Sequence, residues 1–383
     1  MQIEQAGRTS LLALLGSIAL FPLLVLPVIV GGFVDHIGLT ESEAGWATAV
    51  GALGAALTAI PVALTIHHVD LRRLALSGLI VMAIADCLSI AAPSIPVWSF
   101  FLLRFLSGVG AACVYASVMS AYATWKEPDR AYGLFMAVQF AVSAAGLYGL
   151  PLILPIIGIA GLYAGITALD LVATALITRL PDSGERKGAG AHAPLEWHVI
   201  LRRTSLVCLL GIGLFEAANM AHFAYAERIG LSFSLEASQV GAILGIVTVV
   251  GIPGAFAVVW LGDRFGHFKP IAIAVVCQVT ALVLLLTGSA QAIYVIAMCL
   301  LSIAWAFALP YFQAIEADLD PGGSVVVAGG FATGMGASVG PAVAAMLVIP
   351  GQYSGIYVAA AMTYLVVLGL MRYVVRSPVR RQV

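Results

Sequence analysis

Twelve long apolar runs dominate the sequence and constrain its fold more than any other feature. They lie near residues 10–34, 44–66, 73–92, 97–121, 132–154, 158–179, 204–226, 237–260, 270–289, 292–314, 325–348 and 353–375. An α-helix needs about 20 apolar residues to cross the hydrocarbon core of a bilayer. The runs lack the apolar/polar alternation of a transmembrane β-strand and are about twice as long as such a strand. The chain is therefore predicted to be an all-α polytopic membrane protein with 12 transmembrane helices.

The composition excludes an ordinary soluble domain. Apolar residues make up 61% and charged residues 10% of the 383-residue chain, whereas a soluble domain carries about a quarter charged residues. The five cysteines lie inside apolar runs and form no Cys-x-x-Cys pair, which argues against a metal site. No nucleotide-binding loop or zinc-protease motif is present. We expect no cofactor, no metal and no nucleic-acid partner.

The positions of lysine and arginine predict which segments face the cytoplasm. With the N-terminus inside and the runs alternating, 16 of the 18 basic residues fall on the cytoplasmic side. Only Arg228 falls outside, and Arg104 lies within a run. Cytoplasmic loops of membrane proteins carry such an excess of basic residues, so both termini are predicted to be cytoplasmic.

The longest polar stretch divides the chain into two halves of six runs each. It spans residues 181–203, between an N-terminal half at 1–180 and a C-terminal half at 204–383. Gly38-Leu39-Thr40 before the second run matches Gly230-Leu231-Ser232 before the eighth. Internal repeats of this kind are common in secondary transporters, so we expect two pseudo-symmetric six-helix bundles joined by a cytoplasmic linker.

Two cytoplasmic loops carry a family resemblance. Asp263-Arg264-Phe265-Gly266-His267-Phe268-Lys269, between the eighth and ninth runs, resembles the Gly-x-x-x-Asp-Arg-x-Gly-Arg-Lys loop of the major facilitator superfamily. The equivalent loop of the first half keeps Arg72, but has His67 in place of the Asp and Asp70 in place of the second Gly. The resemblance implies that both loops gate the transporter through charged contacts between neighbouring helices.

Elements inside the runs extend the resemblance to the whole chain. Arg104-Phe-Leu-Ser-Gly108-Val-Gly110 in the fourth run is similar to the family's Arg-x-x-x-Gly-x-Gly element, which is tied to proton coupling in many members. Gly336-Ala-Ser-Val-Gly340-Pro341 in the eleventh run is similar to its Gly-x-x-x-Gly-Pro element. The fifth run, where the antiporter signature belongs, lacks the Pro after Gly146. Import and export, and symport, antiport and uniport, therefore stay open.

Ionisable residues inside the runs are the first candidates for proton coupling, because a buried charge costs several kcal/mol unless it is paired or hydrated. Glu216 lies near the middle of the seventh run and Arg104 lies within the fourth. Asp35, at the outer end of the first run, is the acid that we expect to pair with Arg104. Asp86 and Asp170 fall on runs that the resemblance makes peripheral, and we interpret both as structural acids that donate to backbone carbonyls.

The resemblance also implies that the first, fourth, seventh and tenth runs line a central cavity. Polar and aromatic residues on these runs are the predicted solute-binding set: Glu216, Asn219, His222, Tyr115, Trp305, Tyr311 and Gln313. One acid with several aromatic groups suits an amphipathic or weakly charged organic solute. Gly336-x-Ser338-x-Gly340 matches a serine-hydrolase pattern, but inside an apolar helix these small residues serve close helix packing. We therefore do not expect an enzyme.

The sequence thus predicts a secondary active transporter of a small organic solute, coupled to protons, which works by alternating access. We expect a monomer in a bacterial inner membrane. Two alternatives remain at this point, namely an uncoupled facilitator of the same solutes and a receptor or scaffold with a transporter-like fold. The sequence leaves the identity of the solute undetermined.

Overall fold

The computed structural model describes residues 2–66, 68–123, 128–180, 195–262, 264–320 and 322–377. The chain forms two compact units, Met1–His192 and Ala193–Val383, each with its own internal packing. The division falls inside the polar stretch at residues 181–203, of which the structure describes residues 195–203. Each unit is described below by itself.

Unit 1 is built from helices alone over its described residues. In chain order these are α1 (Gln2–Ala19), α2 (Phe21–Leu24), α3 (Leu26–Gly32), the π-helical η1 (Phe33–Ile37), α4 (Glu41–Thr65), α5 (Leu71–Ser89), the short η2 (Ala92–Ser94), α6 (Val97–Tyr122), α7 (Pro128–Leu176) and η3 (Ile177–Arg179). Pro22 and Pro27 each begin a new helical segment in the first run, since proline has no N–H to donate to the preceding turn.

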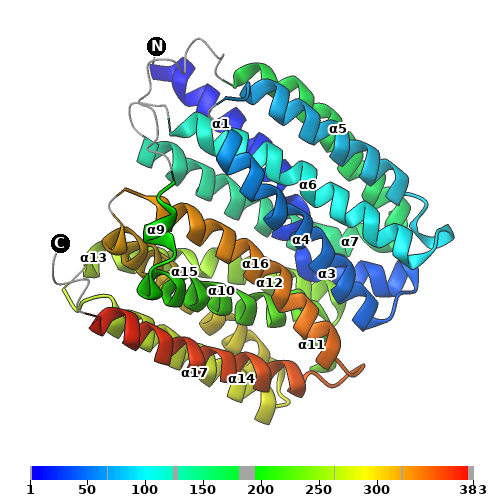
Figure 1. The fold of residues 1–383 in the computed structure, drawn as a ribbon. Coiled ribbons are helices and arrows are strands. Elements are labelled where there is room, and N and C mark those ends of the chain that lie inside the picture. Colours follow the sequence, from blue (N-terminus) through cyan, green and yellow to red (C-terminus); the bar gives the residue numbers. More distant parts are fainter. Residues whose placement is uncertain are drawn as a thin grey trace. The chain divides into compact units, whose positions relative to one another are not determined.

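Unit 2 repeats this pattern with different breaks. Its elements are α9 (Trp197–Ile200), α10 (Arg203–Ala224), α11 (Ala226–Ser232), α12 (Ala237–Val250), α13 (Ile252–Leu261), α14 (Phe268–Thr287), α15 (Gln291–Leu319), α16 (Ser324–Leu347) and α17 (Ser354–Arg376). Figure 1 shows α14 and α17 running side by side, and the two helices are in contact.

The described helices account for the twelve predicted spans. Nine helices are long and apolar enough to cross a membrane by length and composition. One of these, at Arg130–Arg179, breaks at Gly158, whose positive φ of +60° favours glycine, and so contains two spans. The segmented first run and α5, which carries Arg72, Arg73 and Asp86, supply the other two. The prediction of an all-α polytopic protein is confirmed.

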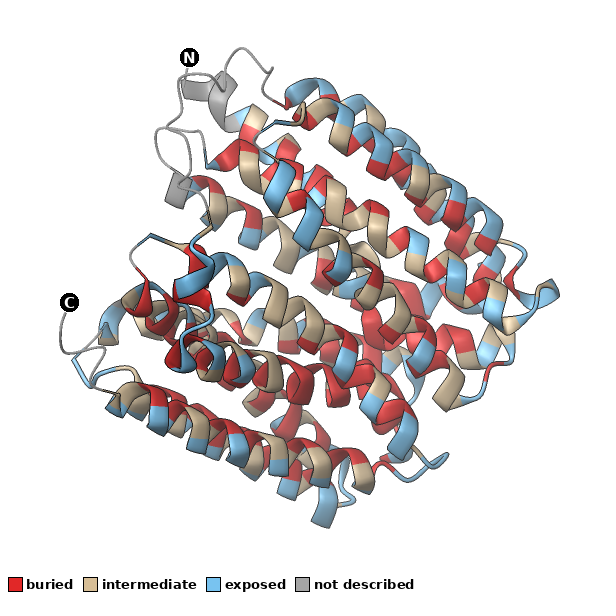
Figure 2. Ribbon diagram, viewed as in Figure 1, coloured by how far each residue is buried: buried red, intermediate tan, exposed pale blue. Residues whose placement is uncertain are grey.

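Lipid-facing stripes are visible on the outer helices. Along α5, the exposed large apolar side chains are Leu76, Ile80, Ile84 and Leu88, which recur every four residues and are 43–56% exposed. Figure 2 shows exposed residues along one side of α5 and of α17, with buried residues on the other side. An apolar stripe of this length on a soluble protein would mark an interaction site, and here it fits contact with lipid tails.

Glycine allows the closest helix contacts, and it does so at equivalent places in both units. A Cβ atom on Gly54 of α4 would collide with the backbone carbonyl of Phe105 in α6. A Cβ atom on Gly254 of α13 would collide with the carbonyl of Ile303 in α15. These contacts join the second run to the fourth and the eighth run to the tenth, as expected of two pseudo-symmetric bundles.

Candidate functional site

Glu216 is held inside unit 2 by a tryptophan. The residue lies in the middle of α10 and is 4% exposed. Its Oε2 accepts a hydrogen bond of 3.0 Å from Nε1 of Trp305 on α15. Among the described residues, Glu216 forms no ion pair with a lysine or arginine. The pair therefore joins two helices through one neutral donor and one buried carboxyl.

Helix α16 reinforces the position of Glu216. A Cβ atom on Gly336 would meet the Gly213 carbonyl and, at 2.9 Å, the Cβ of Glu216. A Cβ atom on Gly340 would collide with the Ala217 carbonyl. The glycines predicted to form a Gly-x-x-x-Gly element thus let α16 cross α10 at backbone contact, which fixes the carboxyl-bearing turn. Ser338 lies between them on an α-helix, without the strand-to-helix turn of a hydrolase nucleophile.

His222 does not converge with Glu216. Its Nε2 lies 3.4 Å from the hydroxyl of Tyr364 on α17, whereas Glu216 faces α15. Six residues turn an α-helix by about 600°, which places the two side chains about 120° apart. Asn219, between them in sequence, is 8% exposed. The structure therefore brings Glu216 and Trp305 together but directs His222 toward a different helix.

Arg104 of α6 is paired with Asp86 of α5 in unit 1. Its Nη2 lies 2.7 Å from Asp86 Oδ1 and also donates to Ser89 Oγ at 2.6 Å. Ser107 Oγ donates to the other carboxylate oxygen at 3.2 Å. The Arg104 guanidinium lies 4.5 Å from the ring centroid of Tyr163 on α7. A buried ion pair with Ser89 as an additional acceptor, Ser107 as an additional donor and a cation–π contact satisfies most of its polar atoms.

The predicted pair of Asp35 with Arg104 is wrong. Asp35 lies in η1 and is exposed, and the partner of Arg104 is Asp86. The α5–α6 hairpin explains this outcome. Asp86 stands one turn before the end of α5, and Arg104 stands two turns into α6, so a short connection brings them to the same depth. The expectation that Asp86 donates to a backbone carbonyl is also wrong.

Asp170 joins the same cluster from α7. It is fully buried, and neither carboxylate oxygen has a hydrogen-bond partner in the described part of the chain. Asp86 and Arg104 both act on it electrostatically. Tyr163 and Asp170 are seven residues apart and therefore share one face of α7. The second predicted structural acid thus lies beside a buried arginine rather than at a backbone carbonyl.

The loop of unit 2 that the resemblance predicts to act as a gate is docked on α15. The hydroxyl of Tyr311 donates to the Gly262 carbonyl at 3.2 Å, and His267 Nδ1 lies 3.2 Å from Asp318 Oδ2. Arg264 and Gly266 are exposed, and Asp263 lies outside the described residues. Tyr311, predicted to bind solute, is 2% exposed and instead anchors this loop. The tenth run therefore restrains the loop between the eighth and ninth.

The equivalent loop of unit 1 is held by different contacts. Asp70 is the N-cap of α5 and accepts a hydrogen bond from the backbone N–H of Arg73. Arg72 Nε donates to the Leu180 carbonyl at 3.0 Å, at the end of the sixth run. Arginine suits this place because helix C-termini leave carbonyls without partners. His67 lies outside the described residues.

The remaining predicted solute-binding residues lie at more open positions. Tyr115 of α6 is 37% exposed, and its ring lies 5.9 Å from that of Phe135 on α7. Gln313 of α15 is exposed. Within unit 2, Gln313 forms no hydrogen bond with Glu216 among the described residues.

Glu316 is a buried acid that the sequence analysis missed. It is 2% exposed on α15, and a Cβ atom on Gly329 of α16 would collide with its carboxylate. The tenth run is predicted to end near residue 314, whereas α15 continues to Leu319. The apolar spacing Ala308, Phe312, Ile315 and Leu319 was the available signal, because it continues one helical face past Glu316.

No group of three or more metal-ligating side chains occurs among the described residues.

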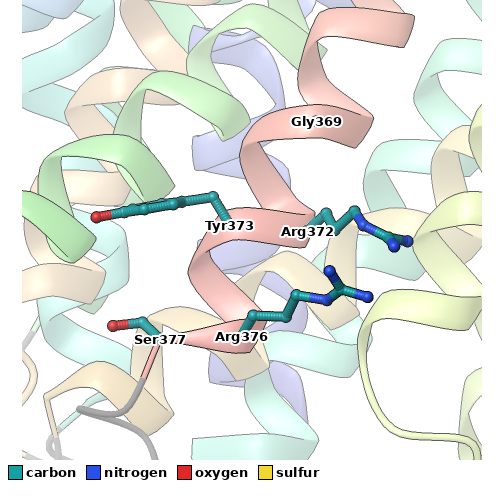
Figure 3. Close-up of a pocket in the computed structure, with 5 residues that line it drawn as sticks. All are labelled: Gly369, Arg372, Tyr373, Arg376 and Ser377. Atoms are coloured by element: carbon teal, nitrogen blue, oxygen red, sulfur yellow. The ribbon is translucent and has the colours of Figure 1, made fainter.

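A hollow beside the C-terminal end of α17 is lined by Gly369, Arg372, Tyr373, Arg376 and Ser377. Figure 3 shows Arg372 and Arg376 pointing to one side of the helix and Tyr373 to the other. Tyr373 also lies under the guanidinium of Arg203, 5.5 Å from its ring centroid. Basic residues here suit the negative end of the helix dipole.

The sequence profile described as Major Facilitator Superfamily matches residues 9–332. The chain belongs to the Major Facilitator Superfamily. The resemblance carried by the two loops and the in-helix elements is therefore confirmed, and membership of this family points to a transporter rather than to an enzyme. No curated protein matches the sequence significantly.

Solved structures share the fold of this superfamily member at low identity. A structure titled as the nucleoside transporter NupG has a TM-score of 0.78 and 13% identity, over 97% of this chain and 98% of that chain. A D-xylose-proton symporter has a TM-score of 0.74 and 13% identity, over 96% and 98%. A bacterial homologue of the lysosomal transporter Spinster has a TM-score of 0.69 and 12% identity, over 96% and 95%.

Proposed function

We propose that the protein is a secondary active transporter that couples the movement of a small organic solute to protons through Glu216. The observation that carries this proposal is the Glu216–Trp305 hydrogen bond between α10 and α15. A carboxyl buried beside a neutral donor can lose its charge by binding a proton, which removes the cost of burying that charge. Proton binding would then alter the contact between the two helices.

The solute class follows from the same groups. Trp305 offers an aromatic face beside one acid, which suits an organic solute with apolar and polar parts. Two proteins with this fold carry the names of a nucleoside transporter and a D-xylose-proton symporter. Nucleosides and pentoses therefore head the panel of solutes to be tested, followed by organic acids, amines and drugs.

The cellular setting is part of the proposal. The placement of basic residues supports both termini in the cytoplasm. We further propose that the protein is a monomer in a bacterial inner membrane. Labelling of single cysteines introduced near residues 36 and 290 from outside intact cells tests this topology. Labelling from the cytoplasmic side alone would contradict it.

Transport by the reconstituted protein tests the function. Proteoliposomes with an imposed pH gradient should accumulate the solute against its own gradient. Glu216→Gln should keep counterflow exchange and lose accumulation, while Glu236→Gln, which changes an exposed acid of the same unit, should behave as the wild type. Accumulation by Glu216→Gln would exclude the coupling role. Equilibration without accumulation in the wild type would identify a facilitator, and absence of flux would favour a receptor or scaffold.

A further inference from the structure

The polar cluster of unit 1 contains more acid than base. It combines Asp86, Arg104 and Asp170, whose exposed fractions are 0%, 6% and 0%. One guanidinium faces two carboxyls in a part of the chain predicted to lie within the bilayer. Two charged acids here would leave one uncompensated negative charge, which is costly in such a place.

The hydrogen bonds in this cluster are unevenly distributed. One carboxylate oxygen of Asp86 accepts a hydrogen bond from Arg104, and the other accepts one from Ser107. Both oxygens of Asp170 and the Nε of Arg104 are buried without a hydrogen-bond partner. The Asp170 carboxyl nevertheless lies within hydrogen-bonding reach of the Asp86 carboxyl. Two carboxylates accept and neither donates, so they form a hydrogen bond only when one of them carries a proton.

We propose that Asp86, Arg104 and Asp170 form a proton-binding site of unit 1, in which one proton is held between the two carboxyls. That proton supplies the missing donor and reduces the charge of the cluster to zero. Glu216 belongs to the other unit, so this site is independent of the proposed coupling role of Glu216.

Asp86 and Arg104 are the charged side chains that interact electrostatically with Asp170 among the described residues. Of the elements packed on α7, the stretch from Thr9 to Gly32, which covers most of α1 and all of α2 and α3, contains no titratable side chain. Asp35 in η1 is exposed, and His36 is half-buried. Tyr163 stacks on Arg104 from α7 itself. Asp86 and Arg104 are therefore the charged groups that decide whether Asp170 carries a proton.

Release of the proton changes the partners of Arg104. Asp170 then becomes charged and can accept a hydrogen bond from Arg104 Nε, the donor without a partner in this structure. Arg104 would bridge Asp86 on α5 and Asp170 on α7 at the same time. The proton thus selects between two hydrogen-bond arrangements across three helices of unit 1.

Infrared difference spectroscopy of the purified full-length protein tests the site. A pH step should produce the carbonyl band of a buried protonated carboxyl in the wild type. One component of the band should persist in Glu216→Gln, which removes the acid proposed for coupling, and that component should disappear in Asp170→Asn. Asp35→Asn, which changes an exposed acid of the same unit, should keep it. An unchanged band in Asp170→Asn would overturn the proposal.

A measurement without substitution covers the case in which Asp170→Asn does not fold. In wild-type protein made by cell-free synthesis, carboxyl-13C aspartate should shift one component of the band, and carboxyl-13C glutamate should leave that component in place. A band in which every component shifts with labelled glutamate and none with labelled aspartate would assign the protons to glutamates and overturn the proposal. Because this readout requires no solute, it stays decisive even if Glu216 proves unnecessary for transport.

Discussion

Arg104 Nη2 lies 2.7 Å from Asp86 Oδ1, across the hairpin formed by α5 and α6. Both side chains are buried, so each depends on the other for its charge to be compensated. The contact links the element that resembles the family's fourth-helix motif to an acid on the third run. Arg104, in the fourth run, thus links α6 to α5 within unit 1 through a buried ion pair.

Asp86→Asn should strongly destabilise the protein, because it removes the carboxylate that forms the ion pair with the Arg104 guanidinium. Removal of one member of a buried ion pair costs about 3–5 kcal/mol. Thermal unfolding in detergent should show a large fall in midpoint for Asp86→Asn and little change for Asp35→Asn. The double variant Asp86→Asn with Arg104→Gln should recover part of the loss. Equal midpoints for the two aspartate variants would contradict the pairing.

Trp305→Phe should destabilise unit 2, because it leaves Glu216 Oε2 without its donor. A buried acceptor without a partner costs about 1–3 kcal/mol. Trp260→Phe is the matched control, since Trp260 is 79% exposed and a surface substitution changes stability by about 0.5 kcal/mol or less. Thermal unfolding compares the two, and an equal response would show that the indole N–H contributes nothing to stability.

Gly329→Ala and Gly330→Ala should differ, although the residues are neighbours on α16. A Cβ atom at 329 would overlap the carboxylate of Glu316, whereas one at 330 meets nothing within 4 Å. The yield of monodisperse protein on size-exclusion chromatography should fall for Gly329→Ala alone. Glu316→Ala should restore the yield when combined with Gly329→Ala, because it removes the obstructing group. Without such rescue, the contact between α15 and α16 would not explain the defect.

Tyr311→Phe should loosen the loop between α13 and α14 because the substitution removes the hydroxyl that binds the Gly262 carbonyl. Hydrogen exchange at residues 262–268 should accelerate, while the solute preference stays that of the wild type. Gln313→Ala, on the exposed part of the same helix, should leave exchange in the loop unchanged. A changed solute preference in Tyr311→Phe would instead support the original prediction that Tyr311 binds solute.

The sequence alone determined the number and positions of the spans, because hydrocarbon thickness imposes a length and a hydropathy that local composition reveals. It also pointed to Glu216 and Arg104, since an ionisable residue inside an apolar run stands out without any partner being known. The breaks inside the first run were not predicted, because Pro22 and Pro27 divide it into shorter helical segments without changing its mean hydropathy.

Only the tertiary structure decided which side chains meet. By their depth along the runs, Asp35 and Asp86 are both plausible ion-pair partners of Arg104. The α5–α6 hairpin places Asp86 rather than Asp35 beside Arg104. His222 and Glu216 are close in sequence, yet the rotation of α10 turns them toward α17 and α15. Contacts between helices depend on the rotation of each helix about its own axis and on the angle at which two helices cross. Hydropathy averaged along a run does not encode either of these. For that reason the spans were predictable and the partners were not.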